Sequence, residues 1–277
     1  MSKQAHAGFP PWLVHEALAA SAARAGGGLR VFGISGLQGS GKSTLAAQLV
    51  AAAGEAGLAA ASVSLDDFYL TAAQRRALAR DVHPLLVTRG PPGTHDVPLA
   101  LATLDALRGG QTPALPRFDK LGDDRLAPEH WTQPPAPLDL LVLEGWCLGV
   151  PAEPEDALRD PLNAIEREED GDGRWRRWCN AALARDYPLL WDRIDVLWFL
   201  QPPGFEAVHT WRGEQERALQ AAEPGRPAMD RAALVRFIQH YERVSRQALR
   251  TMPNIADVRV PLDAARTPLA VVMREGR

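Results

Sequence analysis

Gly36-Leu37-Gln38-Gly39-Ser40-Gly41-Lys42-Ser43-Thr44 is the stretch that decides the fold of this chain. It matches the pattern G-x-x-x-x-G-K-[ST] of a phosphate-binding P-loop at every fixed position. A short apolar run, 29–34, precedes it and is typical of a buried strand, and good helix formers follow at 45–50. This strand, loop and helix context favours a nucleotide site over a glycine-rich turn that holds a lysine by chance.

The residue types of the loop suit phosphate binding. Glycine lets the backbone adopt unusual dihedral angles and approach the phosphate oxygens. The backbone amides then point inward at the positive end of the following helix. We expect Lys42 to reach the β- and γ-phosphates and the Ser43 hydroxyl to bind Mg²⁺. The residues expected to bind the nucleotide are Gly36, Gln38, Gly39, Ser40, Gly41, Lys42, Ser43 and Thr44.

Length and composition indicate the class of protein. A chain of 277 residues, 46% of them hydrophobic, predicts one large domain or one domain with lobes. The net charge of −3 argues against a general nucleic-acid binder. Cys147 and Cys179 have no metal-site spacing, which favours reduced thiols in a cytoplasmic protein. We see no secretory signal and no run near the roughly 18 apolar residues of a membrane span.

Acidic residues follow two further apolar runs. The run 60–65 predicts a second strand, and Asp66 and Asp67 come directly after it. Carboxylates at such a strand end face the ligand crevice of an open α/β sheet, although an aspartate pair can also cap the next helix. The run 138–143 ends in Glu144, which is the Walker-B pattern that places a carboxylate near Mg²⁺.

The remaining segments complete the predicted topology. Strands are expected at 194–200 and 258–260, and the tail 268–274 fits neither state well. Helices are expected at 11–25, 98–107 and 230–252, with glycines 26–28 ending the first. A further helical stretch holds Arg212 and Glu216, whose spacing also fits a surface ion pair. The aromatic residues of 175–191 indicate packing rather than base stacking.

Three loops carry charged residues. The loop 88–96 is rich in Gly and Pro, and the segment 110–137 is long and irregular, which is typical of functional or disordered segments. Their cations could bind an acidic substrate, or they could pair with Asp96, Asp123 or Asp124 and only order the loops. The acidic segment 153–173 has few apolar residues and predicts a solvated loop or an insertion.

Together these motifs resemble the D-glycerate 3-kinase family, which is similar to uridine kinase, phosphoribulokinase and pantothenate kinase. Beyond the P-loop, the resemblance rests on blocks in a specific order along residues 30–250. These blocks are Ser64–Thr71, Arg89-Gly90, Gly93–Asp96, Pro116–Lys120, Asp124-Arg125, Glu144–Trp146, Leu148-Gly149, Trp211-Arg212 and Gln215-Glu216.

The resemblance implies the P-loop NTP hydrolase fold, with a five-stranded parallel sheet, helices on both faces and a helical lid. We accordingly divide the chain into an N-terminal helical extension, 1–28, and a kinase domain, 29–277. Within the kinase domain we expect the lid at about 204–225 and an insertion at 153–174.

The resemblance also implies transfer of the γ-phosphate of ATP, with Mg²⁺, to a small molecule, D-glycerate. Asp66 matches the catalytic base of the uridine-kinase-like group by position, and whether Asp67 shares that role stays open. Lys42 and Arg212 complete the expected catalytic residues, and Ser43 and Glu144 the metal ligands. The expected substrate-binding residues are Asp67, Tyr69, Arg89, His95, Asp96, Arg117, Lys120 and Arg125.

Two alternatives remain open at this stage. One is a uridine- or pantothenate-type kinase. A kinase that phosphorylates a nucleoside would need an aromatic wall on which the base stacks. The other is a non-enzymatic nucleotide-dependent switch. A GTPase would carry an Asn/Thr-Lys-x-Asp motif and Asp-x-x-Gly after the Walker-B strand, and neither occurs at the expected place. The oligomeric state does not follow from the sequence.

Overall fold

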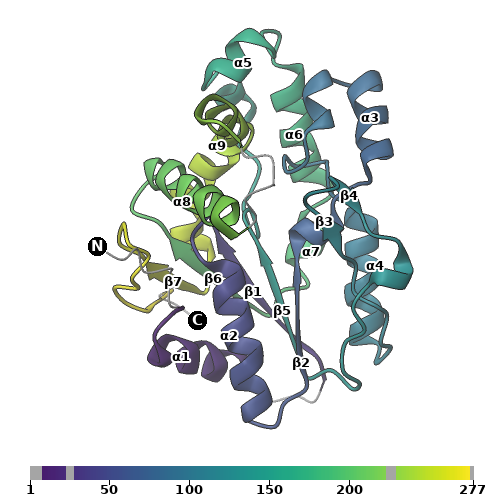
Figure 1. Ribbon diagram of the computed structural model, residues 1–277, viewed down its shortest axis with the longest axis vertical. Coiled ribbons are helices and arrows are strands. Elements are labelled where there is room, and N and C mark those ends of the chain that lie inside the picture. The colour runs from purple at the N-terminus through teal and green to yellow at the C-terminus, as the bar shows by residue number, and fades with distance from the viewer. Residues whose placement is uncertain (1–7, 23–27, 223–228, 275–277) are drawn as a thin grey trace.

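A computed structural model describes residues 8–22, 28–222 and 229–274, and its centre is a six-stranded sheet in the order β2-β5-β1-β6-β7-β8 (Figure 1). The first five strands of this order are parallel, as predicted. The sixth, β8, is formed by the tail and pairs antiparallel with β7 at the edge. The strands of the sheet are β1 Arg30–Gly36, β2 Ala60–Ser64, β5 Leu140–Gly145, β6 Val196–Gln201, β7 Val258–Pro261 and β8 Val272–Met273.

Two hydrophobic cores cover the two faces of the sheet. Alternate residues of β1 separate them: Phe32 and Ile34 belong to one core, and Val31 belongs to the other. Helices α1 and α2 cover the first face, and α4 and α9 cover the second (Figure 1). The α-helices are α1 Pro11–Ala22, α2 Lys42–Glu55, α3 Ala72–Asp81, α4 Val97–Arg108, α5 Ala164–Glu168, α6 Arg174–Arg185, α7 Pro188–Trp191, α8 Glu206–Ala222 and α9 Arg231–Ile255.

Short elements connect the larger ones. The segment 110–137 contains a small antiparallel hairpin, β3 Phe118–Asp119 and β4 Asp124–Arg125. A 3₁₀ turn directly follows β2, so this strand ends one residue earlier than predicted. The 3₁₀ turns are η1 Leu65–Phe68, η2 Pro84–Val87, η3 Pro128–His130 and η4 Glu155–Leu158.

The N-terminal helix packs on the core, as expected. Leu13 and Ala17 are fully buried in the same cluster as Leu45 and Leu49 of α2. The predicted end of this helix, 23–25, and the first two glycines of its stop lie outside the described residues, as do the last residues of the predicted lid, 223–225.

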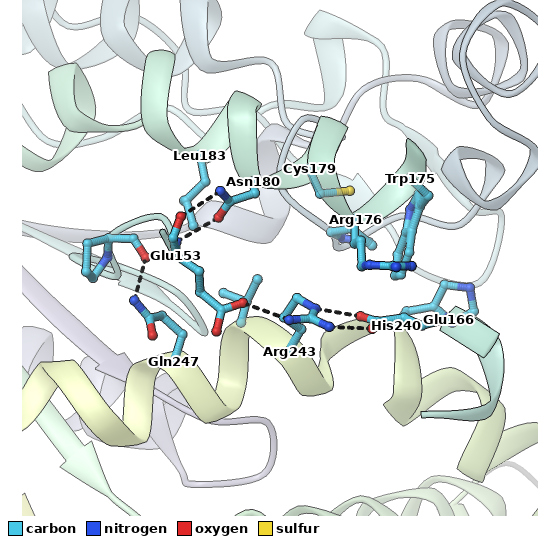
Figure 2. A pocket seen from close by; sticks show the side chains of 13 residues that line it. Glu153, Glu166, Trp175, Arg176, Cys179, Asn180, Leu183, His240, Arg243 and Gln247 are labelled. Carbon is cyan, nitrogen blue, oxygen red and sulfur yellow. Dashed lines mark hydrogen bonds and ion pairs between the residues drawn. The ribbon is translucent and has the colours of Figure 1, made fainter. Parts of the chain in front are cut away.

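Most of the segment 153–173 is exposed, as expected of a solvated loop, but two of its acidic residues are not. Its Glu166 and Asp170 are buried, with 1% and 0% of their surface exposed. Arg243 of α9 binds Glu166 through two nitrogens, as Figure 2 shows, and Arg176 of α6 pairs with Asp170 at 2.9 Å. Arg243, distant in sequence, and Arg176, six residues away, neutralise these two carboxylates, while Glu168 and Glu169 of the same charge run stay exposed.

Among the described helices, none combines the length and apolar character that crossing a bilayer requires.

Candidate active site

The P-loop lies between β1 and α2, and its glycines are required by its shape. Gly39 and Gly41 have φ angles of 79° and 90°, a region that residues with a Cβ rarely adopt. Gly36 has no room for a side chain, since an added Cβ would lie 2.9 Å from the carbonyl oxygen of Leu200 on β6. The sequence therefore builds a compact loop whose backbone is free to surround phosphate.

Helix α8 packs directly on this loop. A Cβ added to Gly39 would lie 2.6 Å from the Cβ of Trp211, which is itself buried. Arg266, from the turn that follows β7, donates from Nε to the carbonyl oxygen of Gly39 at 2.7 Å and lies over the Trp211 ring. Sequence patterns gave no signal for Arg266, because the contact joins residues 227 positions apart.

A hydroxyl and a carboxylate meet at the start of α2. Ser43 Oγ donates to Oε1 of Glu144 at 2.9 Å. Glu144 lies at the end of β5, where it pairs with Ile34 of β1 and Ser64 of β2. Oxygen donors of these two types suit Mg²⁺. The predicted metal ligands are thus adjacent, and they fit a magnesium ion held with nucleotide phosphates.

Other side chains of the P-loop offer groups that could bind an anion. Lys42 is buried and donates from Nζ to the Leu37 carbonyl at 3.1 Å, whereas Ser43 and Thr44 are open to solvent. Burial lowers the pKa of Lys42, and the charges of Glu144 and Asp66 oppose that shift. In the described chain, Nε2 of Gln38 and Oγ of Ser40 are buried without a hydrogen-bond partner. Phosphate oxygens would satisfy such groups.

Asp66 lies in η1 beside this cluster. Its Oδ1 accepts a hydrogen bond from the Tyr69 hydroxyl at 2.7 Å, and its Oδ2 accepts one from Lys120 Nζ at 2.8 Å. Burial alone would raise the pKa of Asp66, but the charge and hydrogen bonds of Lys120 and Tyr69 hold it well below its usual range. The neighbouring carboxylate in turn raises the pKa of Lys120.

Asp67 has a different environment. Its Oδ2 accepts from the Ser64 backbone and from Arg117, at 3.1 and 2.9 Å, and its Oδ1 accepts from the Phe118 backbone at 3.3 Å. Ser64 and Asp67 form a capping box on η1. Of the two interpretations of the aspartate pair, capping therefore describes Asp67, while Asp66 faces the cation of the hairpin.

The predicted cations of the two loops are paired with aspartates. Arg89 binds the Asp123 carboxylate, and Arg125 Nη1 lies 2.9 Å from Oδ2 of Asp96, which also caps α4. These two pairs bring the loop 88–96 and the β3–β4 hairpin together. The interpretation that these arginines order the loops, left open by the sequence, has direct geometric support.

His95 and Tyr69 lie next to each other near Asp66. Their rings stack with centroids 4.7 Å apart, and Nδ1 of His95 lies 2.6 Å from the hydroxyl of Tyr187. Burial lowers the pKa of His95 to about 4. Tyr187 was predicted as a packing residue, and it is fully buried, but its hydroxyl contacts a predicted site residue.

Arg212 extends from α8 toward the same region. Its guanidinium lies over the Phe237 ring and donates to Gln215, and its Nε is buried without a partner among the described residues. Burial lowers the pKa of Arg212, opposed by charges that include Asp66. Glu216 instead accepts from the Met229 backbone, so the described chain shows no ion pair between Arg212 and Glu216.

A separate small cavity lies between α6, α9 and the segment 151–153 (Figure 2). Its volume of about 20 Å³ is room for about one water molecule. Arg243 bridges Glu153 and Glu166 at its wall, and Asn180 bonds the Glu153 backbone. None of the predicted site residues lines it. This cavity is therefore separate from the candidate active site.

Comparisons with known proteins agree with this geometry. The chain is 34% identical over 226 residues to the uncharacterized kinase mug58 of Schizosaccharomyces pombe, covering 76% of this chain and 78% of that protein. It is 30% identical over 227 residues to the chloroplastic D-glycerate 3-kinase of Arabidopsis thaliana, covering 76% of this chain and 46% of that protein. No family model matches.

A solved structure gives the same result. The D-glycerate 3-kinase of Cryptococcus neoformans superposes with a TM-score of 0.75 at 28% identity, covering 95% of this chain and 97% of that one. A P-loop that presents Lys42 and Ser43 beside Glu144 is the arrangement with which P-loop proteins bind a nucleoside triphosphate and Mg²⁺. The chain is an ATP-dependent kinase and belongs to the D-glycerate 3-kinase family of P-loop kinases.

Proposed function

We propose that this kinase transfers the γ-phosphoryl group of ATP to D-glycerate, giving ADP and 3-phosphoglycerate. The observation that carries the proposal is one cluster of four charged groups at the carboxyl ends of β2 and β5 and the start of α2. The charges of Glu144, Asp66 and Lys120 shift the pKa of Lys42, and those of Asp66 and Glu144 raise the pKa of Lys120. In this proposal Lys42 and Glu144 bind the phosphates and the metal ion. Next to them, Asp66 and Lys120 bind the acidic acceptor.

The roles follow from position. The amides of 39–44 hold the phosphates with Lys42, and Ser43 and Glu144 hold Mg²⁺, which when bound neutralises charge on the β- and γ-phosphates. Asp66 orients the acceptor hydroxyl and takes its proton. The new bond forms between the acceptor oxygen and the γ-phosphorus, and the bond from that phosphorus to the β–γ bridging oxygen breaks. Arg212 contacts the transferred phosphoryl group from the lid.

The substrate-binding residues divide into two groups. Arg89, Arg117 and Arg125 are already paired with aspartates, so we propose that they shape the wall of the crevice together with Asp67 and Asp96. The groups that contact glycerate in this proposal are Tyr69, His95 and Lys120. A buried carboxylate needs a cation as its partner. Lys120 lies on the hairpin turn with a side chain that is 60% exposed, so it can leave its ion pair with Asp66 and bind the carboxylate of glycerate instead.

An acceptor screen tests the proposal. ADP release is measured with D-glycerate, glycerol, uridine and pantothenate, and the product is identified by its position of phosphorylation. We expect turnover with D-glycerate alone and none with the Lys42→Ala variant. Equal turnover of glycerol would show that no carboxylate site operates, and ADP release independent of any acceptor would favour a nucleotide-dependent switch.

We also propose a cytoplasmic location for this protein. Its only cysteines, Cys147 and Cys179, are free and buried, which suits a reducing compartment. The Arabidopsis relative is named as chloroplastic. Fractionation of the native cells, followed by detection of the protein in the soluble cytoplasmic or another fraction, decides the question.

A further inference from the structure

The hydrogen bonds of Tyr187 select one form of His95. The Gly93 backbone N–H donates to the Tyr187 hydroxyl oxygen at 2.9 Å, and that oxygen lies 2.6 Å from His95 Nδ1. The hydroxyl has one hydrogen, and Nδ1 is its single acceptor among the described residues. If Nδ1 carried the proton instead, the buried hydroxyl hydrogen would have no acceptor. His95 therefore accepts at Nδ1 and carries its hydrogen on Nε2.

The protonation states of both groups agree with this assignment. Burial lowers the pKa of His95 to about 4, so the ring is neutral near pH 7 and has one N–H. Burial raises the pKa of Tyr187 well above its usual value, so its hydroxyl keeps the hydrogen that Nδ1 needs.

The second nitrogen of His95 has nothing to bind in the described chain. Its Nε2 is buried without a hydrogen-bond partner, in a side chain that is only 4% exposed. A buried N–H is costly unless a partner arrives. The ring stacks on Tyr69, whose hydroxyl bonds Asp66, and the Asp66 charge acts on His95. The ring that carries the unpaired donor thus lies beside Tyr69, the residue whose hydroxyl bonds the proposed base.

We propose that Tyr187 is a positioning residue that fixes the Nε2–H form of His95, and that this N–H donates to the 2-hydroxyl of the acceptor. The inference rests on the proposed function for the identity of the acceptor. A neutral N–H suits a neutral hydroxyl oxygen, whereas the carboxylate requires a cation. The 2-hydroxyl also neighbours the 3-hydroxyl on which Asp66 acts, so one donor and one base would orient the two together.

The test compares D-glycerate with 3-hydroxypropionate, which lacks the 2-hydroxyl. For Tyr187→Phe we expect the KM for D-glycerate to rise roughly tenfold, while the KM values for 3-hydroxypropionate and ATP stay nearly constant. Tyr241→Phe is the matched control, because it removes another buried hydroxyl that bonds the same loop, at the Arg89 carbonyl. We expect that control to affect both acceptors alike.

His95→Gln gives a second control. Glutamine carries a donor near the place of Nε2 and needs no tautomer, so adding Tyr187→Phe to it should change the KM for D-glycerate less than twofold. If Tyr187→Phe instead raises the KM of both acceptors equally, or of neither, Tyr187 has no positioning role.

Nitrogen-15 NMR of the imidazole separates this inference from the proposed function. The spectrum of His95 is assigned by its loss in His95→Gln and is recorded without substrate. We expect the shifts of a neutral ring with the hydrogen on Nε2 in the wild type, and a mixture of tautomers in Tyr187→Phe. A wild-type ring with its hydrogen on Nδ1 overturns the proposal, whichever acceptor the kinase uses.

Discussion

Lys120 Nζ lies 2.8 Å from Oδ2 of Asp66, so the proposed base is ion-paired before any acceptor is bound. A carboxylate held in this way is fully ionised but a poor proton acceptor, because its pKa is well below the usual range. Lys120 comes from an exposed turn, whereas Asp66 is fixed in η1. The pair can therefore open when glycerate offers its own carboxylate, and Asp66 becomes more basic as it does so.

The first prediction concerns pH. Catalysis requires ionised Asp66, so activity is lost as the pH falls through the pKa of this group. Lys120→Met removes the charge that lowers this pKa, and the acid limb of kcat/KM should therefore move to higher pH. The profile of kcat/KM against pH reports the free enzyme, in which the pair exists. Lys120→Arg keeps the charge and should retain the wild-type limb. An unmoved limb in Lys120→Met would show that Asp66 is not the titrating base.

The second prediction separates the two aspartates. Asp66→Asn keeps the shape of the side chain but cannot take the proton, so kcat should fall by roughly 10²–10⁴ with little change in ATP affinity. Asp67→Asn weakens the cap on η1 and the bond to Arg117, so we expect a lower melting temperature and modest kinetic changes. Steady-state kinetics and thermal unfolding of both variants decide the assignment. A crippled Asp67→Asn with an active Asp66→Asn would move the base by one residue.

Local signals in the sequence account for most of the fold. The P-loop and the strands around it were predictable because each depends on neighbouring residues: apolar runs form β1, β5 and β6, and the glycines fit one loop shape. The positions of Asp66 and Glu144 were predictable for the same reason, since each directly follows an apolar run in the sequence. Because β2 and β5 pair in parallel, their carboxyl ends lie at the same edge of the sheet.

Pairing across the chain could not be predicted from local patterns. Arg89 binds Asp123, which is 34 residues away in the sequence, and Tyr187 contacts His95, which is 92 residues away. A charged residue in a polar segment has the same appearance in the sequence whether its partner is solvent, substrate or another side chain. The burial of Glu166 shows the consequence, because only the folded chain brings Arg243, 77 residues away, to its carboxylate.

The third prediction compares two arginines near the crevice. Arg212 has an unpaired Nε, so Arg212→Lys should lower kcat by roughly tenfold or more, because lysine does not reproduce the guanidinium fork. Arg125 is paired with Asp96, so Arg125→Lys should lower the melting temperature and raise the KM of ATP and glycerate alike. Kinetics with both substrates varied, together with thermal unfolding, check this. A selective loss of glycerate binding in Arg125→Lys would instead assign that arginine to the substrate carboxylate.

The last prediction concerns stability, and it follows from the buried pair of Arg176 and Asp170, whose side chains are 3% and 0% exposed. Arg176→Met leaves a buried carboxylate without its cation and also removes a donor from the Leu158 carbonyl. We expect a loss of about 3–5 kcal/mol in the free energy of unfolding, measured by urea titration. The neighbouring pair of Arg185 and Asp186 provides the control, because Arg185 is 69% exposed.

Arg185→Met should therefore leave the urea midpoint nearly unchanged, since an exposed ion pair contributes little. The two variants remove the same charge from the same helix, α6, and differ mainly in burial. If both have the same midpoint, water compensates Asp170, and the segment 153–173 is more open than its contacts indicate. A large loss in Arg176→Met alone means that the acidic segment is held by its ion pairs, and that the same pairs anchor the helix leading to Tyr187.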